Sequence, residues 1–230
     1  IQRCLNLMLD FETLIIRSVT GHRLGKMKSD YSPKVLIGRA ELIFWDFDGV
    51  IMDSVSVKTS AFEELFLPYG QKIAQKVKEH HQVHIGLSRF EKIPLYLSWA
   101  GENVTDELVG KFCNLFAEAV FQSVIESPRV SGVNEYLRRH YQEKYFVLVT
   151  ATPQLEIEKI LSTLEIKHFF RQVFGAPIRK EDALRSVLEK QKVMPHCTLM
   201  IGDAESDLLA AQANSILFLL RRTSENQHLQ

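Results

Sequence analysis

The chain has 230 residues, with 28 lysines and arginines against 28 aspartates and glutamates, so its formal net charge is zero. That length allows one domain, or one domain with a large insertion, and excludes two large domains. The charge balance argues against a general nucleic-acid binder, and a composition of 46% hydrophobic and 24% charged residues excludes a disordered or fibrous protein.

The cysteines and the apolar runs indicate where the protein works. Cys4, Cys113 and Cys197 form no CxxC pair, so the sequence has neither a disulfide framework nor a zinc site of the usual spacing. It has no run of about 18 apolar residues, and its first residues lack the pattern of a signal peptide. We therefore expect a soluble, cytoplasmic protein that binds neither membranes nor nucleic acid. Because the first residue is Ile1, we also expect the numbering to begin inside a longer chain or after processing.

The first 40 residues are expected to be an appendage that ends in a linker. An apolar patch, LNLMLDFETLIIRSV, is followed by HRLGKMKSDYSPKVLIG, which is rich in Gly, Lys, Ser and Pro. Residues 42–45 then form a short apolar run typical of a strand buried on both faces. From residue 54 to residue 130, apolar residues recur every three or four positions, which predicts an inserted set of helices.

Beyond the insertion, strands and helices alternate. The pattern predicts helices at residues 133–141, 153–164, 181–192 and 205–213, and strands at residues 145–149, 172–174, 198–201 and 216–220. Such alternation is typical of an α/β fold with a doubly wound, Rossmann-like parallel sheet. The predicted organisation is an appendage (1–40), a catalytic core (41–53 and 131–225) and an all-helical cap domain (54–130).

Polar residues follow the expected strands at the edge where open α/β sheets bind ligands. Asp46 and Asp48 are two residues apart on extended backbone, so both carboxylates can point to one side. Adjacent carboxylates repel unless a hard cation neutralises them; oxygen ligands favour Mg²⁺, and Asp203 can complete that site. Thr150 and Lys180 offer a hydroxyl donor and a positive charge to phosphate oxygens. The set predicts metal-assisted phosphoryl transfer with a carboxylate nucleophile and a second carboxylate as general acid and base.

Four motifs in order carry a family resemblance. DFDGV, the threonine of FVLVTAT, the lysine of PIRKEDAL, and GDAESD resemble the four motifs of the haloacid dehalogenase (HAD) superfamily. A helical insertion directly after the first motif is similar to the mobile cap of the phosphoglycolate phosphatase and β-phosphoglucomutase branch. True dehalogenases lack the second aspartate of the first motif, so Asp48 argues against dehalogenation.

The resemblance implies a role for each acidic residue. Asp46 would attack phosphorus to give an aspartyl-phosphate, and Asp48 would protonate the leaving oxygen and then deprotonate the attacking water. Asp46, the backbone carbonyl of Asp48 and Asp203 would hold Mg²⁺. Asp207 would lie behind these ligands and orient Lys180 or a metal-bound water.

The resemblance also implies how substrate is held. Thr150 and Lys180 would bind the transferring phosphoryl group. Gly49 and Ala151 would lie against the substrate, the glycine because it lets backbone approach a ligand closely.

One loop of the insertion, GLSRFEK, resembles the substrate-specificity loop of the β-phosphoglucomutase type, in which an arginine reaches the far end of the substrate. Ser88 and Arg89 are therefore candidate substrate-binding residues. The alternative for Arg89 is a surface salt bridge with Glu91 or Glu102.

Three histidines lie near the end of one expected helix. His80 and His84 share a helical face, which would suit a metal site, but no third ligand has suitable spacing. A solvated helix end, where cationic side chains are favoured, is the main alternative for these residues and for His81, and substrate contact is another.

Residues beside the motifs also have alternatives. Thr152 suits the N-cap of the helix that begins at the next proline. Arg179 competes with Lys180 for the third motif. Asp53 and Ser54 either face the substrate or cap the first inserted helix.

The expected function is that of a Mg²⁺-dependent phosphatase acting on a small phosphorylated metabolite, with a lean toward a sugar or sugar-acid phosphate. A phosphomutase with the same aspartyl-phosphate and a non-catalytic module of a larger protein are alternatives. A response-regulator receiver domain uses similar residues, but it has another motif order and no helical insertion. The sequence leaves the oligomeric state open.

Overall fold

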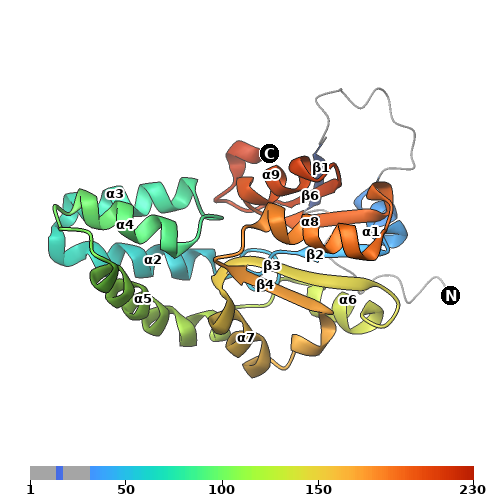
Figure 1. The fold of residues 1–230 in the computed structure, drawn as a ribbon, viewed down its shortest axis with the longest axis horizontal. Helices are drawn as coiled ribbons and strands as arrows, with labels where there is room; N and C mark the ends of the chain where they lie inside the picture. Colours follow the sequence, from blue (N-terminus) through green and yellow to red (C-terminus); the bar gives the residue numbers. More distant parts are fainter. Residues whose placement is uncertain (1–13, 18–31) are drawn as a thin grey trace.

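A computed structural model describes residues 14–17 and 32–230 of the chain (Figure 1). Its centre is a six-stranded sheet in the order β1-β6-β5-β2-β3-β4, in which all neighbours are parallel except β1 and β6. The predicted parallel α/β class is confirmed. The strands are β1 (Leu14–Arg17), β2 (Leu42–Trp45), β3 (Tyr145–Pro153), β4 (Gln172–Ala176), β5 (Thr198–Gly202) and β6 (Leu217–Arg221).

Strand β2 lies inside the sheet because its side chains are apolar on both faces. All four residues of the strand are buried, and β3 and β5 pair with it in parallel on either side. The Trp45 ring packs against the rings of Tyr136 and Phe146. Parallel pairing brings the carboxyl ends of β2, β3 and β5 to one edge of the sheet, so the residues that follow these strands lie close together.

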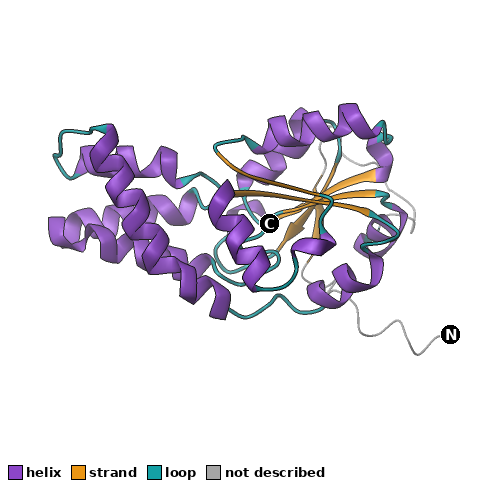
Figure 2. Cartoon of the chain, turned by 60° about the horizontal axis from the view of Figure 1, so that its bottom comes forward, coloured by secondary structure: helices purple, strands orange, loops and turns teal. Residues whose placement is uncertain are grey.

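Helices cover both faces of the sheet (Figure 2). These helices are α1 (Pro33–Arg39), α6 (Val133–His140), α7 (Gln154–Thr163), α8 (Lys180–Gln191) and α9 (Glu205–Ala213), with 3₁₀ turns at Leu67–Tyr69, Lys167–Phe169, Pro195–Cys197 and Gln227–Leu229. One hydrophobic cluster joins residues of α1, α6 and α7 to one face, and a second joins residues of α8 and α9 to the other.

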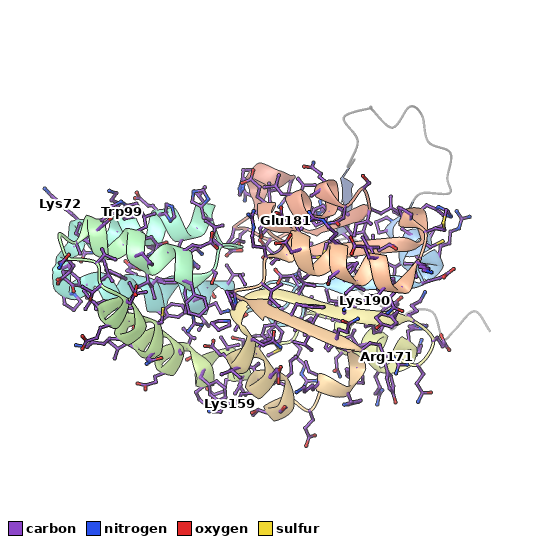
Figure 3. All side chains as sticks on the ribbon, viewed as in Figure 1. Lys72, Trp99, Lys159, Arg171, Glu181 and Lys190 are labelled. Carbon is purple, nitrogen blue, oxygen red and sulfur yellow. The ribbon has the colours of Figure 1, made fainter. Side chains whose placement is uncertain are left out.

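The segment between β2 and α6 forms the predicted set of helices, which we call the helical insertion. It consists of α2 (Val55–Phe66), α3 (Gln71–Val83), α4 (Arg89–Trp99) and α5 (Asp106–Glu126). Aromatic side chains fill its centre, among them Phe62 and Phe116 with ring centroids 3.9 Å apart. Lys72 and Trp99 lie at the end of the insertion farthest from the sheet (Figure 3).

Among the described residues, α5 alone is long and apolar enough to cross a membrane by length and composition. Its residues Phe112, Phe116, Val120 and Val124 are buried. That pattern is the amphipathic one of a helix packed against its neighbours in a folded domain.

Part of the segment expected to be an appendage belongs to the core in the structure. Strand β1 extends the sheet by pairing with β6, and α1 buries Leu36 and Ile37. The sequence contains a signal for the start of α1 that the predicted linker did not take into account. Ser32 accepts a hydrogen bond from the Val35 N–H, and a proline occupies the first helical position. Cys4 lies outside the described residues.

Strand β3 is longer than predicted and ends at Pro153 rather than Val149. Its pairing with β4 shifts register between Val149 and Pro153, so the strand continues past the apolar run that the periodicity detects. Thr150 and Thr152 therefore lie within the strand, and Thr152 does not cap α7.

Candidate active site

Three buried carboxylates meet at the carboxyl edge of the sheet. Asp46 follows β2, Asp203 follows β5, and Asp207 lies in the first turn of α9. Each offers a ligand oxygen within 4.8 Å of the others. Asp46 and Asp203 lie far apart in the sequence, and the parallel pairing of β2 with β5 brings them together. These side chains repel one another unless cations lie among them.

Lys180, at the start of α8, supplies one such cation. Its ammonium lies 2.9 Å from Asp46 Oδ2 and 2.6 Å from Asp207 Oδ1. These carboxylates raise the pKa of Lys180 despite its burial, and burial together with the Asp207 charge raises the pKa of Asp46 to about 7. Arg179 is exposed and lies 3.4 Å from Glu181, away from this cluster. Of the two candidates for the third motif, Lys180 is the one in the cavity.

Asp203 offers an oxygen that a second cation could bind. Its Oδ2 is buried and has no hydrogen-bond partner among the described residues. Burial and the nearby Asp46 carboxylate raise the pKa of Asp203 well above its usual value. A buried carboxylate oxygen without a donor, beside two more carboxylates, fits a divalent cation with oxygen ligands.

Gly49 allows the loop after β2 to lie against Asp203. Its φ is +72°, and a Cβ at this position would lie 2.0 Å from Asp203 Oδ2. Any other residue would be strained by the backbone conformation and would also collide with the carboxylate. Gly49 therefore shapes the acidic cluster from the other side.

Asp48 has a different environment from Asp46. Its carboxylate accepts hydrogen bonds from Lys58 Nζ at 2.5 Å, Ser54 Oγ at 2.7 Å and Thr152 Oγ1 at 3.1 Å. Burial alone would raise the pKa of Asp48, but the Lys58 ammonium and these donors lower it. The side chain of Asp48 thus faces the helical insertion rather than the acidic cluster.

Two expected capping roles are replaced by these contacts. Ser54 stands at the N-cap of α2 but makes no side-chain capping bond, since its hydroxyl donates to Asp48. Thr152 makes the equivalent contact from β3. Asp53 is exposed, and its carboxylate lies 3.3 Å from Arg221.

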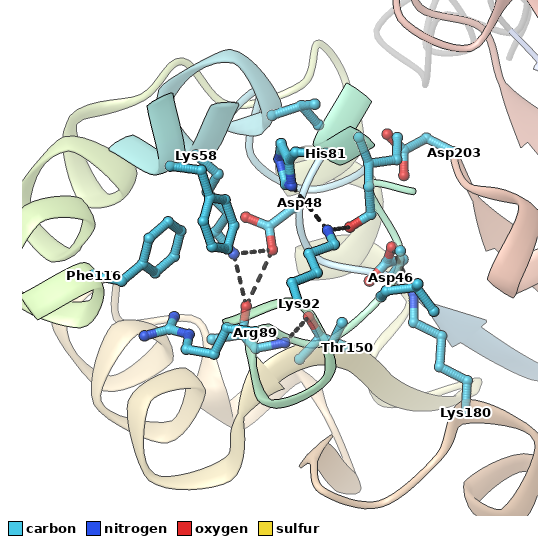
Figure 4. Close-up of a pocket in the computed structure, with 17 residues that line it drawn as sticks. Asp46, Asp48, Lys58, His81, Arg89, Lys92, Phe116, Thr150, Lys180 and Asp203 are labelled. Carbon is cyan, nitrogen blue, oxygen red and sulfur yellow. Dashed lines mark hydrogen bonds and ion pairs between the residues drawn. The ribbon is translucent and has the colours of Figure 1, made fainter. Parts of the chain in front are cut away.

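A small cavity of about 40 Å³ separates the acidic edge of the core from the helical insertion (Figure 4). Thr150 and Ala151 of β3 line it, as do Asp46, Asp48, Lys180 and Asp203. Thr150 is buried, and its Oγ1 accepts the backbone N–H of Thr152 at 3.2 Å. The structure thus brings the core residues singled out by the sequence, apart from Gly49 and Asp207 at its border, to one cavity.

The insertion contributes a basic wall to the same cavity, formed by Lys58, His81, Arg89 and Lys92. Arg89 is buried, lies 2.7 Å from Glu156 Oε1 in α7, and stands over the Phe116 ring. The alternative prediction, a surface salt bridge of Arg89 with Glu91 or Glu102, is therefore wrong.

Ser88 caps α4 in the structure. Its hydroxyl accepts the N–H of Phe90, while Glu91 accepts the N–H of Ser88, completing a capping box. Ser88 lines a neighbouring hollow rather than the cavity that holds Asp46.

The three histidines at the end of α3, His84 being its C-cap residue, do not converge on one site. His80 lies 3.0 Å from the Tyr96 hydroxyl, and its ring is 4.4 Å from that of His84. His81 faces the cavity and is buried. In the described part of the chain, the acidic cluster is the only group of side chains suited to a metal, so a histidine metal site is not supported.

Lys58 and Lys92 were missed by the sequence analysis. Both stand on the apolar faces of their helices, Lys58 between Val55 and Phe62, and Lys92 beside Tyr96. A lysine at a position where the helical period favours an apolar residue is a signal for a functional side chain, because lysines are almost never fully buried unless they are paired.

Comparisons with known proteins agree with the four motifs found in the sequence. A family model described as haloacid dehalogenase-like hydrolase matches residues 43–220. A phosphoglycolate phosphatase of Pseudomonas putida is 28% identical over 183 residues, which cover 76% of this chain and 66% of the relative. A phosphorylated carbohydrates phosphatase of Thermotoga maritima is 24% identical over 182 residues, covering 76% and 82%. The chain therefore matches just under two thirds of the first relative's length.

The fold is also shared with solved structures. A predicted phosphoglycolate phosphatase from Haemophilus somnus superposes with a TM-score of 0.60 at 18% identity, covering 78% of this chain and 84% of that one. A likeness at this level of identity extends to the fold and no further.

Proposed function

The chain belongs to the haloacid dehalogenase-like hydrolase family, and from that premise we propose that it is a phosphatase that forms an aspartyl-phosphate on Asp46. The substrate is a small phosphorylated metabolite. The proposal rests on the position of Asp46. Its carboxylate follows β2 at the edge of the sheet, contacts Lys180, and lines a cavity whose opposite wall is basic.

The orientation of Asp46 suits attack on phosphorus. Its Oδ1 accepts the N–H of Phe47 at 2.7 Å, and its Oδ2 lies 2.9 Å from Lys180 Nζ. Both contacts hold the carboxylate in one orientation at the cavity. In the first step an Asp46 oxygen bonds to phosphorus as the bond to the leaving oxygen breaks, and Lys180 and Thr150 stabilise the charge on the phosphoryl oxygens.

Asp48 manages the protons. Lys58 favours its carboxylate form, which accepts the proton of the water that hydrolyses the aspartyl-phosphate. In the first step the leaving oxygen takes a proton that passes from the Lys58 ammonium through Asp48, to which Lys58 is hydrogen-bonded. The proton that Asp48 accepts from water in the second step returns to Lys58, so both groups end in their starting states.

A divalent cation fits the acidic cluster on the evidence of the unpartnered Asp203 oxygen. Bound by Asp46, Asp203 and the backbone carbonyl of Asp48, Mg²⁺ would neutralise the carboxylates and the phosphoryl oxygens as they come together.

The relatives support a phosphatase of small substrates without naming this one. They include phosphoglycolate phosphatases and a phosphorylated carbohydrates phosphatase.

The test is to incubate purified protein with p-nitrophenyl phosphate and a panel of sugar phosphates and phosphorylated acids, with Mg²⁺ or with EDTA. We expect release of inorganic phosphate in the presence of Mg²⁺ and none in the presence of EDTA. An isomerised sugar phosphate without free phosphate would favour the phosphomutase, and no turnover of any compound would favour a non-catalytic module.

A further inference from the structure

Among the lysines and arginines that line the cavity, one cation differs from the rest. Lys180 lies against Asp46 and Asp207, Lys58 against Asp48, and Arg89 against Glu156. Lys92 is 1% exposed, yet no carboxylate of the described residues lies within ion-pair distance of its ammonium.

The contacts of Lys92 are neutral or apolar. Its Nζ lies 2.8 Å from His81 Nδ1 and 3.4 Å from the carbonyl oxygen of Ile85, and it stands 5.7 Å from the centre of the Phe62 ring. Burying a lysine without an acidic partner is costly. Burial and the Lys58 charge accordingly lower the pKa of Lys92 well below its usual value. An anion beside it would restore the charged form.

His81 provides a second group in the same place. When Lys92 is charged, its ammonium can only donate to Nδ1, and the neutral imidazole then carries its proton on Nε2. That Nε2 is buried and has no hydrogen-bond partner among the described residues, although the His81 side chain lines the cavity. Buried donors are nearly always satisfied, so a ligand group in the cavity would complete the hydrogen bonding of this nitrogen.

We propose that Lys92 and His81 form a subsite for a carboxylate of the substrate, so that the protein selects phosphorylated acids over neutral sugar phosphates. The inference rests on the proposed phosphatase function and extends it to the far end of the substrate.

A carboxylate fits this subsite better than a second phosphate does. One ammonium and one imidazole N–H match the two oxygens of a carboxylate, and together they carry one positive charge. The cavity that contains them also contains Asp46, and its free volume is about 40 Å³. The carboxylate and the phosphoryl group are therefore separated by a short carbon chain.

The test compares two substrates that differ at one group, 2-phosphoglycolate and 2-hydroxyethyl phosphate. We expect the wild-type protein with Mg²⁺ to favour the carboxylate in kcat/KM by about ten- to a hundredfold, the range of a charged hydrogen-bonded contact. Lys92→Met should remove most of that ratio, mainly through KM for 2-phosphoglycolate. Lys111→Met, at an exposed position of α5, should leave it unchanged.

His81→Phe is a second variant that keeps an aromatic ring against Phe62 while removing both ring nitrogens. It should lower the ratio less than Lys92→Met does, and it decides the matter if Lys92→Met does not fold. Equal losses on both substrates would mean that the pair is structural and would overturn the inference.

The outcomes separate this inference from the proposed function. A wild-type protein that hydrolyses p-nitrophenyl phosphate but shows no preference between the two substrates overturns the subsite alone. A wild-type protein without activity on any of the three overturns the proposed function and the subsite with it.

Discussion

The core wall of the cavity is acidic, whereas the wall contributed by the helical insertion is basic. Asp46 and Asp207 share one ammonium, that of Lys180, at the strand edge, and Asp203 lies beside them. Lys58 and Arg89 of the insertion reach acidic partners that belong to the core, Asp48 and Glu156.

This difference in charge indicates that the two walls have different roles. The core wall has an excess of negative charge, which suits a metal and a nucleophile. The basic wall is attracted to it, so ion pairs hold the insertion over the site. Of the lysines and the arginine in this wall, Lys92 alone has no acidic partner among the described residues. Metal binding and nucleophilic attack are therefore assigned to the core wall and substrate selectivity to the insertion, and each assignment can be tested separately.

The largest effect is expected from Asp46→Asn. Because the amide cannot attack phosphorus, turnover of p-nitrophenyl phosphate should fall at least about a thousandfold, equivalent to about 4 kcal/mol of activation free energy. The fold should persist, since Lys180 keeps its contact with Asp207. Asp182→Asn, on the exposed side of α8, is the matched control. Retention of more than about a tenth of the activity would contradict the nucleophile assignment.

Lys180→Met tests whether the core wall needs its cation to fold. Loss of one partner of a buried ion pair typically costs about 3–5 kcal/mol, because the remaining charge is uncompensated. We expect a decrease of that size in the free energy of unfolding, measured by urea denaturation. Lys190→Met, exposed on the same helix, should change it little. Equal stability of the two variants would show that Asp46 and Asp207 tolerate each other without the lysine.

Mg²⁺ should stabilise the wild-type protein through the core wall. At a concentration about 100 times the dissociation constant, a bound ion adds about 2.7 kcal/mol to the free energy of unfolding. A thermal melt with Mg²⁺ and with EDTA measures the shift. Asp203→Asn should abolish it, while Asp182→Asn should retain it. A shift that survives in Asp203→Asn would place the ion elsewhere.

The contact between the walls can be measured by a double-mutant cycle on Arg89 and Glu156. Neighbouring charged residues in one buried pair typically show a coupling of about 0.5–3 kcal/mol. We expect a favourable coupling within that range from unfolding of Arg89→Met, Glu156→Gln and the double variant. Strictly additive effects would mean that this ion pair does not hold the insertion to the core.

The smallest effect concerns Lys92 and depends on pH. Its pKa in the folded protein lies below the ordinary value of 10.5, so the unfolded state binds more protons between the two values. The wild-type protein should therefore gain stability as pH rises through that interval, whereas at lower pH it bears the full cost of the buried charge.

Lys92→Met lacks this dependence and should exceed the wild type by about 1 kcal/mol at neutral pH. The difference should shrink as pH approaches 10.5, which denaturant titrations at several pH values can follow. A difference that grows with pH would contradict the depressed pKa.

The sequence alone determined the α/β class, the place of the insertion and the acidic strand ends. These features follow from local patterns: buried runs such as residues 42–45, the helical period after residue 54, and carboxylates two apart at Asp46 and Asp48. The four ordered motifs identified the family, which the match over residues 43–220 confirms.

The tertiary structure determined which residues of different elements contact one another. The pairing of β1 with β6, the reach of Arg89 to Glu156, and the contact of Lys58 with Asp48 join residues of different elements, and no local period encodes them. Periodicity specifies which face of a helix is buried, but only packing specifies what that face meets. Lys92 and His81 illustrate the limit: the sequence places each on a helix, and only the fold turns both toward the cavity that contains Asp46.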